Sequence, residues 1–166
     1  MQLDRLDIAL LTALRDHPRA GPLELSRQLR VARATVQARL QRLESSGVVT
    51  GYGPDIDLEA AGQQLIAFVT LEIAQGALDQ VAAELEGMPT ILEAYVTTGA
   101  ADVLCKVATT SHLDLQETLL ELNRSASVVR STSVVVLGTV VPPRVLPLLE
   151  RSADRDARAP AYRSGR

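Results

Sequence analysis

Aromatic residues and cysteine are scarce in this chain of 166 residues, which has one Phe, three Tyr, no Trp and a single cysteine, Cys105. One cysteine excludes an internal disulfide framework and a metal site built from several thiolates. Its position in the alternating run VLCKV predicts a buried core thiol rather than a nucleophile. With so few aromatic side chains, the sequence shows no evident stacking platform for single-stranded nucleic acid.

Long hydrophobic runs are also missing. No apolar run approaches the roughly 20 residues of a membrane span, and the first residues, MQLDRLD, lack the basic-then-apolar order of a signal peptide. We therefore expect a cytoplasmic protein without a membrane partner. The apolar content of 46% is sufficient for one domain of ordinary size or two small ones.

Residues that could perform catalysis do not converge. The two histidines, His17 and His112, fall in different predicted domains, and no motif pairs either of them with a nucleophile. The run Gly51-Tyr52-Gly53 is too short and wrongly placed for a phosphate-binding loop. The sequence thus predicts no enzyme activity, no cofactor and no metal site.

Positive charge is unevenly distributed, although the net charge is only −3. Residues 19–43 contain six arginines against the single Glu24, whereas residues 61–142 contain three basic residues against nine acidic ones. A basic segment followed by an acidic body is the charge distribution expected when one part of a protein binds nucleic acid.

The basic segment contains a stretch, RQLRVARATVQARLQRLESSG (residues 27–47), that is typical of a DNA-recognition helix. Val36, Leu40 and Leu43 form one apolar stripe at helical spacing, and short residues on other faces allow close approach to a large surface. Gln and Thr can hydrogen-bond base edges, and Arg can bind guanine or phosphate. The predicted base contacts are Thr35, Gln37, Ala38 and Gln41, and the predicted phosphate contacts are Arg33, Arg39 and Arg42. Arg39 lies nearer the apolar stripe, so an ion pair within the domain is an alternative for it, and a solvated Arg-rich helix is an alternative for the whole stretch.

Two further helices precede this one. Asp4 can cap a helix that ends before Pro18, and Asp7 is well placed for its dipole. Pro22 can begin a second helix, and the run Arg30-Val31-Ala32 then forms a turn before a third helix from about Arg33 to Ser46, stopped by Gly47. Three helices with a tight turn between the last two predict a helix-turn-helix domain in residues 1–50.

A different pattern follows a linker predicted at residues 51–64. Strands are expected at 65–73, 91–98, 102–109 and 128–141, and helices at 77–86 and after Ser111, where Asp114 completes a start like a capping box. This order predicts an α+β fold, a ferredoxin-like βαββαβ domain over residues 65–142. The extension 143–166 is expected to be disordered from about residue 151. Its arginines could contact DNA, but a solvated tail is the favoured interpretation.

Both faces of the predicted sheet are apolar. Leu65, Ala67, Val69 and Leu71 form one face of the first strand, while Ile66 and Phe68 lie on the other. Helices in such a fold cover only one face. The second face therefore needs a cover, and the same face of another copy would supply one, so the pattern predicts a homodimer.

With these features in order, the chain resembles the leucine-responsive regulatory protein/AsnC family of transcription regulators. The motifs that carry the resemblance are LDRLDIALLTALRDHPRA, ELSRQL, RATVQARLQRLESSGVVTGY and, in the second domain, VTTGAADVLCKV. The resemblance implies a sequence-specific regulator of double-stranded DNA with an effector domain that senses amino acids. It also implies dimers that often assemble into tetramers or octamers. Two departures concern the helix-turn-helix, where Arg30 replaces the usual glycine of the turn and Ala32 replaces the usual serine cap.

The resemblance also places the effector site at a loop between subunits, formed by Thr97, Thr98, Gly99, Ala100, Ala101 and Asp102. Asp102 could accept the ammonium group of an amino acid, although a cap of the turn is an equal alternative. Ala100 and Ala101 stand where an acidic and an aromatic residue are common in the family. A larger, less polar pocket follows, and with it a preference for a bulky apolar or aromatic amino acid such as phenylalanine.

Two other functions are compatible with the sequence. One is a small-molecule-sensing module that acts through protein contacts and has a degenerate DNA-binding half, which Arg30 and Ala32 would favour. The other is an architectural protein that coats DNA with little sequence preference. DNA-binding measurements at several salt concentrations would separate these from a sequence-specific regulator.

Overall fold

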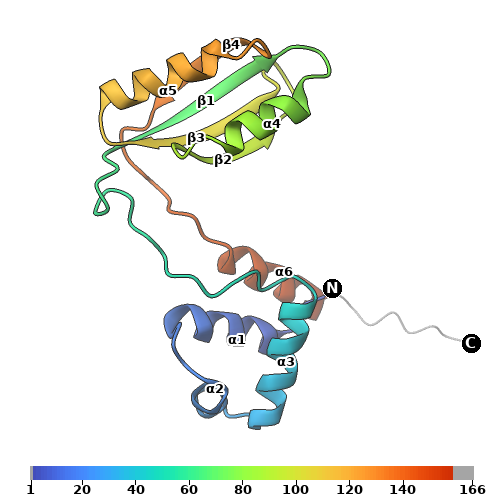
Figure 1. The fold of residues 1–166 in the computed structure, drawn as a ribbon. Coiled ribbons are helices and arrows are strands. Elements are labelled where there is room, and N and C mark those ends of the chain that lie inside the picture. Colours follow the sequence, from blue (N-terminus) through green and yellow to red (C-terminus); the bar gives the residue numbers. More distant parts are fainter. Residues whose placement is uncertain (1, 159–166) are drawn as a thin grey trace, which may run out of the picture. The chain divides into compact units, whose positions relative to one another are not determined.

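A computed structural model of the chain describes residues 2–158, with side chains as far as residue 152. The chain forms two compact units (Figure 1). The first contains the N-terminal residues as far as Asp55 together with the chain from Val141 onward, and the second is Ile56–Val140. None of the helices in the described part of the chain is long and apolar enough to cross a membrane.

The first unit contains the three predicted helices, α1 (Arg5–Asp16), α2 (Pro22–Leu29) and α3 (Arg33–Ser45). Their shared core consists of Leu10, Leu25, Val36 and Leu43, all of which are buried. The start of α1 is a complete capping box, in which the Asp4 and Asp7 side chains accept each other's backbone N–H. The predicted helix-turn-helix is thus confirmed.

The turn between α2 and α3 has the conformation that a glycine would adopt easily. Arg30 lies in the left-handed region at φ 55° and ψ 42°, and its backbone N–H donates to the Ser26 carbonyl. It is the one residue other than glycine with a positive φ in the described part of the chain. α3 then begins after Ala32, which makes no side-chain cap. The turn therefore adopts the left-handed conformation although Arg30 replaces glycine, and α3 begins without the side-chain cap that a serine would supply.

The prediction of a disordered C-terminal extension is wrong for the part that the structure describes. The sequence was expected to be disordered from about residue 151, but a helix, α6, spans Leu146–Arg158 and packs against α1. Leu146 and Leu149 are half-buried, whereas Leu148 is exposed. The half-buried pair is one helical turn apart, and in the rest of α6, after Leu149, the sequence has only polar residues and two alanines, so this short apolar stripe gave no clear periodicity. Residues 159–166 of the predicted tail lie outside the described residues.

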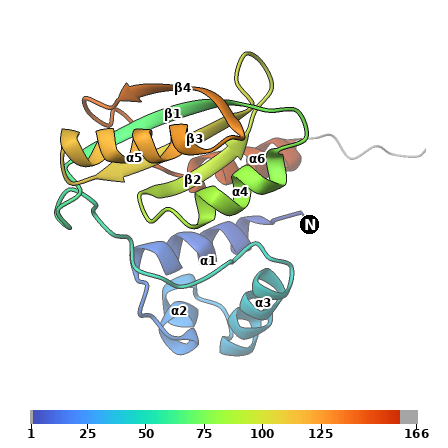
Figure 2. The same ribbon diagram turned by 45° about the horizontal axis from the view of Figure 1, so that its top comes forward.

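The second unit is the predicted ferredoxin-like domain (Figures 1 and 2). Its strands are β1 (Leu65–Ile73), β2 (Ile91–Val96), β3 (Val103–Thr109) and β4 (Val128–Val135), and its helices are α4 (Leu78–Glu86) and α5 (His112–Arg124). The strands form one antiparallel sheet in the order β2-β3-β1-β4. Both helices cover the same face, where Val69, Leu71, Cys105 and Val107 are fully buried against Val81.

The opposite face of this sheet has no cover within the described chain, as the sequence predicted. Phe68 lies between Lys106 of β3 and Val134 of β4 in the strand register. Phe68 is 41% exposed, and Val134 is 64% exposed. We refer to this surface, which also carries Glu93 and Tyr95 of β2, as the open face.

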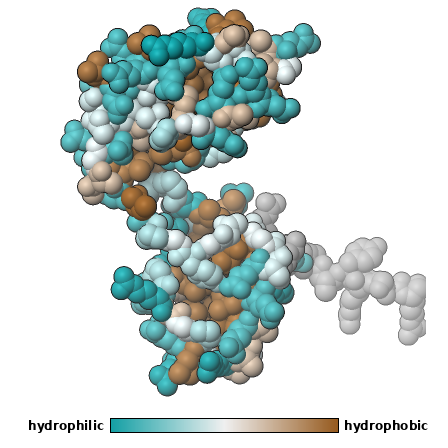
Figure 3. All heavy atoms as spheres, viewed as in Figure 1, coloured by the Kyte–Doolittle hydropathy of each residue, from teal (hydrophilic) through white to brown (hydrophobic). Residues whose placement is uncertain are grey.

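The last strand is shorter than predicted. β4 ends at Val135, opposite Ala67, instead of continuing to residue 141, because its neighbour β1 begins at Leu65 and extends only two residues past this pair. The final backbone bond runs from the Val136 N–H to the Ile66 carbonyl. Leu137 and Val140 beyond it are almost fully exposed. Hydrophobic residues also reach the surface elsewhere in both units (Figure 3).

Candidate functional site

The solvent face of α3 presents the residues predicted to contact bases. Gln37, Ala38 and Gln41 are exposed, and Thr35 is half-buried one turn earlier. Val36 and Leu43 point into the core from the other side of the helix. The buried apolar stripe therefore fixes which face of α3 is outward, and that face carries small and amide side chains that suit the major groove.

Two of the three arginines predicted to contact phosphate form ion pairs within the domain. Arg39 Nη1 donates to both Asp4 carboxylate oxygens at 2.8 and 2.7 Å and to Asp7 Oδ1 at 2.7 Å. Arg42 Nη2 donates to the two Asp7 oxygens at 2.6 and 2.5 Å. The Asp7 side chain is fully buried, while 25% of Arg39 and 46% of Arg42 remain exposed. These four residues form an ion-pair network that links α1 to α3.

This network changes the charge of the recognition helix. The hydrogen bond from Arg39 holds the pKa of Asp4 below its ordinary value, and the two carboxylates raise the pKa of Arg39. The alternative noted for Arg39 is therefore what the structure shows. Arg42, which the sequence assigned to phosphate, pairs with Asp7 in the same way. Asp7 was predicted only as a favourable residue at the start of a helix, because no local pattern reveals a partner 32 or 35 residues away.

The predicted effector loop connects β2 to β3 and is tied down by its own ends. Asp102 Oδ2 accepts the Ile73 N–H at 2.8 Å, and the Asp102 N–H donates to the Leu71 carbonyl. The Thr97 hydroxyl donates to the Ala101 carbonyl at 2.7 Å. Gly99 has a φ of 128°, which favours glycine at this position. The alternative role for Asp102, as a cap of the turn, is thus present, although its Oδ1 has no partner among the described residues.

A cavity of about 300 Å³ lies beside Asp102. Both apolar and polar residues line it, and they include two of the six predicted loop residues, namely Thr97 and Asp102. Thr98, Gly99, Ala100 and Ala101 are not part of its wall. The remaining lining residues are Ile73, Ala74, Gln75, Gly76, Leu78 and Val96. Sequence reasoning missed the stretch 73–78, which lies some 25 residues earlier in the chain, and its one local signal was Gly76.

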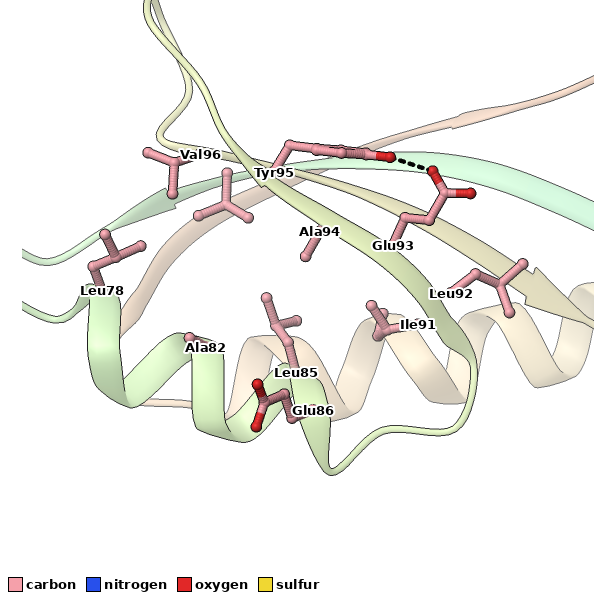
Figure 4. A pocket seen from close by; sticks show the side chains of 11 residues that line it. Leu78, Ala82, Leu85, Glu86, Ile91, Leu92, Glu93, Ala94, Tyr95 and Val96 are labelled. Carbon is pink, nitrogen blue, oxygen red and sulfur yellow. Dashed lines mark hydrogen bonds between the residues drawn. The ribbon is translucent and has the colours of Figure 1, made fainter. Parts of the chain in front are cut away.

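A second hollow, of about 330 Å³, lies between α4 and the edge strand β2 (Figure 4). Leu78, Ala82 and Leu85 of α4 point toward the strand, and Ala94 points back toward the helix. Tyr95 points away to the open face, where its hydroxyl donates to Glu93 and so raises the pKa of Tyr95. This groove shares Leu78 and Val96 with the cavity beside Asp102.

The two histidines and the single cysteine, for which the sequence predicts no catalytic or metal-binding role, do not form a common site. His17 follows α1 and His112 begins α5, and both are exposed. Cys105 is buried in the sheet, and this burial raises the pKa of its thiol to about 11, so the thiolate is a small minority at neutral pH. Among the described residues, no group of three or more His, Cys, Asp or Glu side chains could hold a metal ion.

Comparison with known proteins agrees with both units. Residues 3–50 match the model of a winged helix-turn-helix DNA-binding family, and residues 66–146 match that of the Lrp/AsnC ligand binding domain. An uncharacterized HTH-type transcriptional regulator of Pyrococcus abyssi is 31% identical, over 84% of this chain and 89% of its own length.

Solved structures show the same architecture. Escherichia coli AsnC superposes with a TM-score of 0.83 at 25% identity, over 89% of this chain and all of that one. A transcriptional regulator from Neisseria meningitidis in complex with L-Met superposes at 0.79 with 26% identity, over 85% of this chain and 94% of that one. The chain therefore belongs to the Lrp/AsnC family, and it is a DNA-binding transcriptional regulator whose activity is modulated by an effector.

Proposed function

We propose that the protein recognises a specific double-stranded DNA site through α3. Thr35, Gln37, Ala38 and Gln41 contact base edges, and Arg33 at the start of the helix contacts phosphate. The observation that carries this assignment is the outward face of α3, where exposed amide and small side chains lie opposite the buried stripe of Val36 and Leu43. Residues near the N-terminus of a recognition helix are those that meet base edges in other helix-turn-helix proteins.

We further infer that the effector is an amino acid with a bulky apolar or aromatic side chain. The wall of the cavity beside Asp102 supports this, because Ile73, Ala74, Leu78 and Val96 supply apolar surface. Each methylene group buried there contributes about 0.8 kcal/mol, so the size of the side chain decides the ranking of ligands.

The ammonium and carboxylate groups of an amino acid also have suitable partners beside this cavity. The free Oδ1 of Asp102 can accept the ammonium group while Oδ2 continues to hold the Ile73 N–H. α4 begins beside the cavity at Leu78, and its N-cap Ala77 makes no side-chain hydrogen bond. Its first backbone N–H groups can therefore donate to a carboxylate.

The proposed working form is a cytoplasmic homodimer joined through the open face. The exposure of Phe68, Tyr95 and Val134 supports this, since one face of the sheet is covered by helices and the other is not. Assembly into tetramers or octamers is proposed from the family resemblance alone.

DNA binding by the full chain tests the function. A preferred site is first selected from a pool of randomised duplexes, and its affinity is then compared with that of a random duplex across a salt series. A sequence-specific regulator should favour its site by at least about 10³. Equal affinities would instead identify an architectural protein, and no binding at physiological salt would identify a module that acts through protein contacts. Gln37→Ala should lower the ratio, whereas Gln28→Ala, an exposed glutamine on α2, should not.

Calorimetric titration with the twenty amino acids tests the effector. Phenylalanine should bind more tightly than glycine, aspartate or lysine. Asp102→Asn keeps an oxygen acceptor for the Ile73 N–H but removes the charge, so it should weaken binding while the domain stays folded. Tightest binding by a small or charged amino acid, or equal binding by parent and variant, would rule out this assignment.

A further inference from the structure

The six arginines of residues 19–43, which extend from the loop before α2 to the last turn of α3, fall into two groups. Arg39 and Arg42 on α3 are neutralised by Asp4 and Asp7 of α1. Of the remaining four, Arg19 lies in the loop before α2. The other three lie around the turn between α2 and α3, within seven residues, and they are Arg27, Arg30 and Arg33.

The three arginines at the turn are exposed and have no carboxylate partner. Within the part of the chain whose side chains are described, no acidic group lies within ion-pairing distance of Arg27, Arg30 or Arg33. Glu24 on α2 is the nearest acidic residue in the sequence, and it forms no ion pair with them. The unneutralised positive charge of this helix pair is therefore concentrated at the turn and not along the middle of α3.

Arg30 holds its position there against a conformational cost. Its φ of 55° lies in the left-handed region, which residues with a side chain rarely adopt. A glycine would satisfy the turn without that cost. Among the residues that the structure describes, no contact favours an arginine, because its side chain is exposed and forms no ion pair with them. A residue kept in a costly conformation without an internal partner points to a partner outside the chain.

We propose that Arg30 binds a DNA phosphate, flanked by Arg27 and Arg33, at the edge of the groove that α3 enters. This proposal rests on DNA binding by α3. The turn immediately precedes the end of the recognition helix that meets the bases, so it lies beside the backbone of the strand that borders the groove. An arginine there neutralises phosphate charge, and this contributes affinity without sequence preference.

Because the contact is independent of sequence, a random duplex at low salt is a sufficient probe for the full-length protein. Arg30→Gly removes the charge and relieves the backbone. For each bound subunit, we expect the slope of log K against log salt to flatten by about 0.9, and the affinity at 0.1 M salt to fall about eightfold. The thermal stability of the same variant should rise, because glycine adopts the left-handed conformation freely. Arg30→Lys keeps the charge and should retain the slope of the parent.

Arg19→Ala is the matched control, since Arg19 is also exposed and has no ion pair with the side chains that the structure describes, but it lies outside the turn. Its slope should equal that of the parent. If Arg30→Gly becomes more stable and binds DNA as the parent does, Arg30 has no phosphate partner and the proposal is wrong. Equal flattening by both variants would show general surface charge and would also overturn it. A parent that binds no duplex at low salt would instead remove DNA binding itself.

Discussion

Single residues show where the sequence was informative and where it was not. The outward residues of α3 follow from the spacing of Val36, Leu40 and Leu43, which is a local property. The partners of Arg39 and Arg42 do not follow from a local property, because Asp7 lies 32 or more residues away and contacts them only through the packing of α1 against α3. The sequence of a recognition helix therefore predicts that its basic residues contact DNA, even where an acidic residue of another helix neutralises them.

The buried Asp7 makes a prediction about stability. Asp7→Asn keeps an oxygen that can accept the Asp4 N–H in the capping box of α1, but it loses the charge that holds Arg39 and Arg42. Hydrogen bonds between charged groups contribute about 1.5–3 kcal/mol, so the free energy of unfolding of the first unit should fall by about 2 kcal/mol. Hydrogen-exchange mass spectrometry of α1 and α3 peptides in urea would measure it. Asp16→Asn, at the exposed end of α1, is the control and should have little effect. Equal protection in all three proteins would contradict a stabilising network.

Acid should weaken the same network. The pKa of Asp4 lies below its ordinary value of 3.8, chiefly because Arg39 donates a hydrogen bond to it. A lowered folded-state pKa stabilises the protein above the ordinary value, and this stabilisation is lost as the pH falls through the folded-state pKa. Protection of α1 peptides should thus decrease below about pH 4, and Arg39→Gln should reduce that dependence. A variant with the pH profile of the parent would exclude Asp4 as the cause.

At the scale of helices and strands, most bounds followed from periodicity and from Gly and Pro positions. β4 was predicted six residues too long, because the valines and leucine beyond Val135 have the composition of a strand but, past the bond from Val136 to Ile66, no strand to pair with. α6 was missed for the opposite reason. Its apolar stripe is brief, and the charged residues that follow resemble a solvated tail. Strand pairing and helix packing are tertiary facts, and composition alone does not contain them.

α6 is expected to stabilise the DNA-binding unit. Ile8 on α1 is only 6% exposed yet does not belong to the core shared by α1, α2 and α3, and α6 packs against α1. Leu149→Asp, at a half-buried position, should therefore destabilise the unit by about 1–2 kcal/mol through lost apolar burial. Leu148→Asp lies one residue away at an exposed position and should change little.

Protection of α1 peptides against hydrogen exchange would measure both variants. Removal of the chain after Val145 should reproduce the effect of Leu149→Asp, because it uncovers the same face of α1. Equal behaviour of Leu148→Asp and Leu149→Asp would show that α6 does not pack through its half-buried face. The family model ends at residue 146, so most of this helix lies beyond the part that the model covers.

At the scale of the whole molecule, the order of the two domains and the existence of an uncovered sheet face could be predicted from the sequence. The alternation of Leu65, Ala67, Val69 and Leu71 with Ile66 and Phe68 already assigned residues to two apolar faces. The sequence did not say which face the helices cover, and the structure shows that it is the face of Leu65, Ala67, Val69 and Leu71. The effector cavity could be predicted only in part. Its wall combines the end of β1 and the start of α4 with the end of β2 and Asp102. Apart from Gly76, the residues between 73 and 78 carry no local signal that marks them.

The open face leads to the last prediction, which concerns assembly. Phe68 lies near the middle of this face, with Lys106 and Val134 as its neighbours in the register. Two-fold symmetry would bury it twice, and burial of each copy contributes about 2 kcal/mol. The loss of about 4 kcal/mol in Phe68→Glu corresponds to a roughly thousandfold weaker dimer. Leu120→Glu, on the exposed side of α5, is the control and should remain dimeric.

Sedimentation equilibrium at micromolar concentration would separate these variants, and DNA binding supplies a second measure. A dimer presents two recognition helices to successive major grooves about 34 Å apart, so the selected site should be roughly palindromic. Phe68→Glu should then lose its preference for the full palindrome but bind one half-site as the parent does, because α3 itself is unchanged. A parent that sediments as a monomer, or a variant that still dimerises, would show that this face is not the interface. In that case the exposure of Phe68 and Val134 would require a different partner.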